Sequence, residues 1–234
     1  GANDAIRATA GTGTIQLNVT AAVNGSNDAL ELTSNGTKTV TVNAAGSLIG
    51  AIDAVNSIGT GALILDNSGI VSGIVRQQGV APVTVTNRAG ATLTTTFLLD
   101  TISNAGTLNI AGSNVFGAGA DSFTNAVGGI LNVTSNTTLG GLETFIQNGR
   151  INLNTFTLTG PAIAFTNTGT IDTNGSATLA GFTSLTNAGT IDLAAGTFTG
   201  PAAFTNNGTI LADEGASTIS GQTNFANSGT LDLQ

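Results

Sequence analysis

A phrase of eight residues recurs at a nearly constant step in the C-terminal half of the chain. It reads Phe-Thr-Asn-x-Gly-Thr-Ile-Asp, and its copies begin at Phe165, Leu185, Phe204 and Phe225, at steps of 20, 19 and 21 residues. Weaker copies precede these from about residue 102 onward. A unit this short cannot bury its own apolar face and must stack on its neighbours. The repeat therefore predicts a solenoid.

The residues within each unit favour strands over helices. Gly169-Thr170-Ile171-Asp172 alternates polar and apolar residues at period two and is bounded by turn formers, which is typical of a strand. A second alternating phrase in each unit is centred on Leu139, Leu158, Leu179, Phe198 and Ile219. Because successive coils run the same way round, equivalent strands should pair in parallel, about 4.8 Å apart. We expect an all-β fold, a parallel β-helix solenoid of roughly eleven coils with about 20 residues per coil, right-handed by the crossover preference.

Three repeat positions predict ladders that run from coil to coil. An apolar ladder would stack inside the solenoid and consists of Phe123, Phe145, Phe165, Leu185, Phe204 and Phe225. Two residues later, an amide side chain can bond its own turn and the next coil, at Asn104, Asn125, Asn167, Asn187, Asn206 and Asn227. Glycine follows, where we expect it to supply a positive φ, at Gly106, Gly149, Gly169, Gly189, Gly208 and Gly229. In the copy that begins at Phe145 the nearest Asn is Asn148, so we expect a rebuilt turn there.

The regularity of the repeat changes along the chain. We expect a single β-helix domain over residues 1–234, with regular repeats in 83–234 and irregular coils with larger turns in 1–82. One stretch, residues 46–58, has two interpretations. Leu48, Ile52, Val55 and Ile58 keep helical spacing, which indicates a short helix, but an irregular buried strand also fits.

Composition excludes several classes of function. With 40 % hydrophobic and only 8 % charged residues, the chain should fold. The net charge is −8 and the five basic residues are scattered, so no basic stripe offers a nucleic-acid interface. The chain contains no Cys and no His, which removes disulfides, thiolate metal sites and the commonest general base. It has no apolar run of about 20 residues, so we expect no direct membrane insertion.

Carboxylates offer two candidate sites. Asp172, Asp192 and Asp232 share one repeat position and form either a weak calcium ladder or a solvated face; we expect the solvated face, and no cofactor. Asp213 and Glu214 are adjacent, and paired carboxylates can act as the acid and the base in a polysaccharide-cleaving β-helix. Neighbours on a strand point apart, however, and the stretch 212–216 is turn-like, so we expect this pair to serve solubility. We therefore expect no enzymatic activity.

The repeated phrase and the Cys-free, Gly/Thr/Asn/Ala-rich composition resemble the passenger domains of bacterial autotransporters. They are also similar to the haemagglutinin-type repeats of secreted filamentous adhesins. The resemblance covers about two-thirds of the chain and implies secretion through a Gram-negative outer membrane, with display at, or release from, the cell surface. Adhesion, autoaggregation, biofilm formation and surface-layer formation are the roles that it implies.

Several partners fit this resemblance. The sequence stops within a strand phrase and shows no cap, so we expect head-to-tail stacking with another copy or further coils of a longer chain. The first alternative is a ligand-binding adhesin for a surface glycan or a neighbouring cell, with its specificity in the irregular loops of residues 20–60. A polysaccharide-cleaving β-helix fits less well, because the chain has no Trp or Tyr to hold sugar rings.

Overall fold

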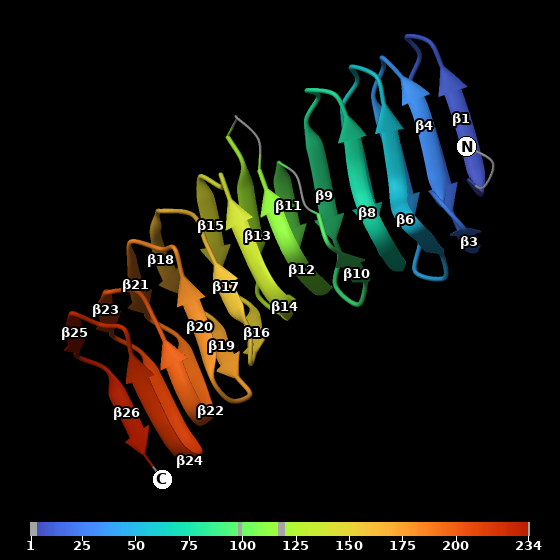
Figure 1. Cartoon of the computed structure of the whole chain (residues 1–234). Coiled ribbons are helices and arrows are strands. Elements are labelled where there is room, and N and C mark those ends of the chain that lie inside the picture. The colour runs from blue at the N-terminus through green and yellow to red at the C-terminus, as the bar shows by residue number, and fades with distance from the viewer. Residues whose placement is uncertain (1–3, 98–99, 117–119, 234) are drawn as a thin grey trace. The chain divides into compact units, whose positions relative to one another are not determined.

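The computed structural model describes residues 4–97, 100–116 and 120–233. The chain divides into two compact units, Gly1–Asn109 and Ile110–Gln234, and each is described by itself. Secondary structure in the described ranges consists of 26 β-strands (Figure 1). The strands pair in parallel, and the chain makes about ten turns, roughly 21 residues apart. The predicted all-β parallel β-helix is confirmed.

The first unit contains two parallel sheets, and successive turns contribute successive strands to each. One sheet has the order β1 (Ile6–Ala10), β4 (Leu30–Ser34), β6 (Ser47–Ile58), β8 (Ile70–Gln78) and β10 (Thr92–Thr95), and β3 (Ala22–Gly25) also pairs with β6. The other has the order β2 (Ile15–Val19), β5 (Lys38–Val42), β7 (Leu63–Asn67), β9 (Val83–Asn87) and β11 (Thr101–Asn104). Paired residues on the first turns are 23 to 25 positions apart, so these turns are longer than those of the C-terminal repeat.

Residues 46–58 form no helix, so the helical interpretation of this stretch is wrong. Residues 47–58 form β6, a strand of 12 residues. Its pairing with β8 shifts register between Ile49 and Asp53 and again between Asp53 and Val55. Such irregularities insert extra residues into a strand and change which side chains point inward. Leu48 and Val55 are fully buried and Ile52 is half exposed, so the helix-like spacing arises from an irregular strand.

The second unit repeats the same plan with shorter turns. One sheet has the order β13 (Ser122–Asn125), β15 (Thr144–Gln147), β18 (Ala164–Asn167), β21 (Ser184–Asn187), β23 (Ala203–Asn206) and β25 (Asn224–Asn227). The other contains β14 (Ile130–Gly140), β16 (Arg150–Asn154), β19 (Thr170–Thr173), β22 (Thr190–Thr199), β24 (Thr209–Ser220) and β26 (Thr230–Leu233). Two short strands, β17 (Thr157–Thr159) and β20 (Ala177–Ala180), connect β14 to β22 along a further ladder. The remaining strand, β12 (Thr107–Val115), contains the boundary between the two units.

Alternation at period two decides which residues fill the interior. Ile171 and Ile191 pair in register on β19 and β22 and are fully buried, whereas their neighbours in sequence are partly exposed. The stretch 212–216 lies inside strand β24, so the expectation of a turn there is wrong. Two register shifts in the pairing of β22 with β24 bend the strand without ending it. No helix long and apolar enough to cross a membrane is found in the described part of the chain.

Candidate functional site

The amide ladder is the most regular polar feature of the interior. In the second unit, Nδ2 of Asn167 donates to Oδ1 of Asn187 at 2.8 Å, and Nδ2 of Asn187 donates to Oδ1 of Asn206 at 2.8 Å. Nδ2 of Asn206 donates to Asn227 at 2.7 Å, and Asn167, Asn187 and Asn206 are fully buried. Each of these Nδ2 groups also donates to backbone carbonyls, as Asn187 does to those of Gly189 and Thr209. From Asn167 to Asn227 the ladder therefore ties each turn to the next through amide side chains.

Gln147 takes the place of asparagine in this ladder. The sequence predicted a rebuilt turn near Asn148 but did not predict this role for Gln147. It accepts from Nδ2 of Asn125 at 2.9 Å, and its own Nε2 donates to the carbonyl of Gly149 at 2.8 Å. Nε2 of Gln147 also donates to the carbonyl of Thr170 on the next turn at 3.4 Å, but it does not donate to the side chain of Asn167. Oδ1 of Asn167 is buried without a hydrogen-bond partner. The ladder is thus interrupted at one step.

The ladder also occurs in the first unit. Nδ2 of Asn67 donates to Oδ1 of Asn87 at 2.8 Å, and Nδ2 of Asn87 donates to Oδ1 of Asn104 at 2.8 Å. All three residues are fully buried. On the preceding turns the equivalent positions are Val42, which pairs with Asn67, and Val19, which pairs with Val42. The irregular first turns therefore fill this position with apolar side chains.

The predicted apolar ladder lies in register within the second unit. The rings of Phe123 and Phe145 are 5.0 Å apart between centroids, and those of Phe145 and Phe165 are 5.1 Å apart. A further ring, Phe182, joins this stack, 4.6 Å from Phe165. The repeat gave no sign of Phe182, because it comes from the loop between β20 and β21. A Cβ at Gly160 would lie 1.9 Å from the Phe182 ring, so Gly160 makes room for it.

The rest of the apolar ladder follows the same register. Phe165 pairs with Leu185, Leu185 with Phe204, and Phe204 with Phe225. Leu185 and Phe204 are buried, whereas Phe225 on the last turn is 42 % exposed. The predicted apolar residues therefore lie next to one another on successive turns, and the ladder is exposed at Phe225.

The glycines that follow the amide ladder are required for a different reason from the one expected. They do not have positive φ; glycines with positive φ in the described chain lie elsewhere, as at Gly181 and Gly221. A Cβ on Gly169 would instead lie 1.9 Å from the carbonyl oxygen of Gly149 on the preceding turn. The same clash occurs at 2.0 Å for Gly189 and at 2.1 Å for Gly208 and Gly229. Glycine is needed here because the backbones of adjacent turns approach too closely for any side chain.

Lys38 is a fully buried cation in the first unit. Its Nζ donates to the carbonyls of Ser34 and Gly61, both at 2.8 Å. Lys38 forms no ion pair with a described carboxylate. Desolvation by burial lowers the pKa of Lys38, because the charged form loses its hydration.

The column of residues that includes Asp172 borders a polar groove of about 390 Å³. The groove is lined by Arg150, Asn152, Asn154, Asp172, Thr173 and Asn174. Asp172 forms an ion pair with Arg150 and lies in register with Asp192. Asp192 then pairs with Leu211, and Leu211 with Asp232, so the predicted carboxylate ladder is interrupted. Its arrangement favours a solvated, partly neutralised surface.

Comparisons with known proteins identify no relative. A scan against protein-family models, a search of curated proteins and a search of solved structures each gave no match to this chain. The fold itself defines the class: a parallel β-solenoid with an amide ladder in its interior.

Proposed function

We propose that the chain is a non-catalytic structural or adhesive β-helix displayed at the surface of a Gram-negative bacterium. The proposal joins the resemblance to autotransporter passengers and filamentous haemagglutinins with the observed solenoid. Its main support is the amide ladder, which joins turns over 19 to 21 residues at a time from Asn167 to Asn227. Because each turn bonds to its neighbours in the same way, such a structure can be lengthened by adding further turns of the same kind. Length and a continuous lateral surface are what a stalk requires.

The last turn of the second unit exposes apolar side chains that continue the buried ladders. Phe225, Leu231 and Leu233 are 42 %, 43 % and 74 % exposed. Their partners on the preceding turn, Phe204, Ile210 and Ala212, are 1 %, 1 % and 7 % exposed. The exposed set continues the buried ladders and would be covered by another turn, from a second copy or from further coils. Strand addition at such an edge supplies backbone hydrogen bonds together with apolar contact.

Sedimentation velocity and electron microscopy across a concentration series test the assembly. The full 234-residue chain should form rods that lengthen with concentration. The variant Leu233→Lys should shorten them, because a charge would enter the covered face. The control Val127→Lys changes an 82 % exposed side chain outside the last turn and should leave assembly unchanged. A chain that stays monomeric at all concentrations would refute end-to-end assembly.

The polar groove favours a second candidate, a binding module for a hydroxyl-rich ligand such as a surface glycan. Amide, carboxylate and hydroxyl groups of Asn154, Asp172 and Thr173 line it, and they can exchange hydrogen bonds with sugar hydroxyls. The groove lies in the second unit, outside the loops of residues 20–60 in which the sequence predicted the specificity of an adhesin. Saturation-transfer NMR with bacterial surface oligosaccharides would test it. Loss of transfer in Asn154→Ala would support the groove, and unchanged transfer would refute it.

A further inference from the structure

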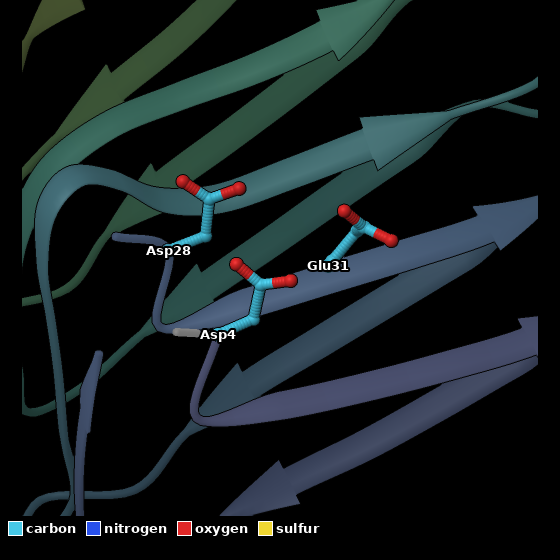
Figure 2. A group of neighbouring side chains, drawn as sticks. All are labelled: Asp4, Asp28 and Glu31. Carbon is cyan, nitrogen blue, oxygen red and sulfur yellow. The ribbon is translucent and has the colours of Figure 1, made fainter. Parts of the chain in front are cut away.

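Three carboxylates meet near the start of the first unit. Asp4 lies just before β1, Asp28 just before β4, and Glu31 within β4 (Figure 2). The backbone amide of Ala5 donates to the carbonyl of Asp28 at 3.0 Å, which places Asp4 and Asp28 at equivalent points of adjacent turns. Carboxylate oxygens of the three residues lie within 4.8 Å of one another. The side chain of Asp4 is 3 % exposed, Asp28 is 3 % exposed, and the side chain of Glu31 is 18 % exposed.

The positive charge at this cluster is smaller than the negative charge. Arg7 bridges Asp4 and Glu31, with Nη2 at 3.0 Å from Oδ2 of Asp4 and Nε at 2.7 Å from Oε1 of Glu31. Asp28 accepts from the amide of Asn56 at 2.9 Å, but it forms no ion pair with any described residue. A buried carboxylate is strongly disfavoured unless a positive charge or a proton compensates it.

Asp53, on the next turn, supplies an independent observation. The amide of Ala29 donates to the carbonyl of Asp53 at 2.9 Å, so Asp53 lies over Asp28 as Asp28 lies over Asp4. Asp53 is 3 % exposed, and its Oδ1 is buried without a hydrogen-bond partner. Arg76 lies 3.2 Å from the other oxygen, Oδ2.

The charge balance of this stack fits a divalent cation. Asp4, Asp28, Glu31 and Asp53 carry four negative charges when ionised, and Arg7 and Arg76 carry two positive charges. Two negative charges remain, in a group of which three members are almost fully buried. An unpartnered buried carboxylate oxygen beside this group is typical of a cation ligand.

We propose that Asp4, Asp28 and Glu31 bind one Ca²⁺ that joins the first two turns, with the buried carboxylate of Asp53 on the turn that follows. Oxygens this close together can all reach an ion at about 2.4 Å, the usual Ca²⁺–oxygen distance. The donors are hard oxygens only, and the chain has no His or Cys that would favour zinc or copper. Ca²⁺ tolerates an irregular ligand set better than Mg²⁺ does, and these ligands come from irregular turns. This site is separate from the assembly surface of the last turn.

Calorimetric titration and thermal unfolding of the full chain test the proposal. After treatment with a chelator, CaCl₂ should bind with a stoichiometry of one, and the Tm should rise with the Ca²⁺ concentration. MgCl₂ at equal concentration should raise the Tm less. Asp28→Asn should abolish both signals, and Glu31→Gln, which changes a more exposed ligand, should weaken binding if Asp28→Asn does not fold.

Asp66→Asn is the matched control. Asp66 is also an aspartate of the first unit, but its carboxylate is paired with Arg88 away from the cluster, so this variant should bind Ca²⁺ as the unaltered chain does. Absence of heat and of a Tm shift up to about 10 mM Ca²⁺, roughly ten times the weak limit of about 1 mM for extracellular calcium modules, would overturn the proposal. An equal Tm shift in Asp28→Asn and in the unaltered chain would also overturn it, because the ion would then bind elsewhere.

Discussion

Lys38 should make the stability of the fold rise with pH. It is the single lysine of the chain and is fully buried, with Nζ bonded to backbone carbonyls. Burial lowers its pKa below the ordinary 10.5. Between the lowered pKa of the folded state and the ordinary pKa of the unfolded state, the unfolded chain binds more protons. The free energy of unfolding therefore increases as the pH rises through this window, and it levels off above about 10.5.

The size of the increase follows from the pKa difference. Each unit by which burial lowers the pKa of Lys38 adds about 1.4 kcal/mol to the free energy of unfolding once the pH exceeds both values. The composition isolates this effect, because the chain has no His, Cys or Tyr. Between pH 7 and about 11, the other group that ordinarily titrates is the α-amino group. The pH profile in this range should therefore report on Lys38.

Urea unfolding followed by far-ultraviolet circular dichroism measures the profile. The unaltered chain should become more stable as the pH rises from the lowered pKa of Lys38 toward about 10.5, and Lys38→Met should lose this dependence because it removes the titrating group. Arg88→Met changes an exposed cation that stays charged throughout and should keep the dependence. A flat or falling profile for the unaltered chain would refute the reasoning, as would an equal rise in Lys38→Met.

Three further substitutions, and one control substitution, test the ladders by urea unfolding. Gln147→Asn should raise the free energy of unfolding by about 1 kcal/mol, because a shorter amide can donate to the unpartnered oxygen of Asn167; an unchanged or lower value would contradict the interrupted ladder. Gly189→Ala should cost at least about 3 kcal/mol, because its Cβ would lie 2.0 Å from a backbone oxygen. Gly140→Ala is the control, because the nearest atom to its Cβ would be 4.0 Å away, and it should change the free energy of unfolding by less than about 0.5 kcal/mol. Similar losses in Gly189→Ala and Gly140→Ala would contradict the close approach of adjacent turns. Phe165→Ala should cost about 3–5 kcal/mol by opening the ring stack, and a loss below about 1 kcal/mol would show that the stack is not a packed core.

The parallel solenoid was predictable because two periods agree in the sequence. The step near 20 residues sets the turn, and the alternation in phrases such as Thr170-Ile171-Asp172 sets which residues point inward. The amide positions followed from the same register. Lys38 could have been found as well, because it shares its alternation with Val40 and Val42, both of which are fully buried.

Other features depend on distances that no repeat contains. The sequence shows a glycine after each amide, but only the spacing of adjacent turns shows that a Cβ at Gly189 would meet the backbone of Gly169. The meeting of Asp4, Asp28 and Glu31 was hidden because the first turns are longer than the C-terminal repeat. The helical spacing in residues 46–58 was misleading because register shifts in a strand can imitate it.

A distance between spin labels tests in-register stacking most directly. The chain has no cysteine, so labels can be attached at Thr144→Cys and Asn224→Cys, both exposed positions of the second unit. Register places these residues four turns apart, through positions 164, 184 and 203. With about 4.8 Å per turn, the two backbone sites should be about 19 Å apart, and double electron–electron resonance should give a narrow distribution near that value, broadened by the label linkers. A broad distribution, or a distance far above it, would contradict a solenoid in which each turn lies directly on the last.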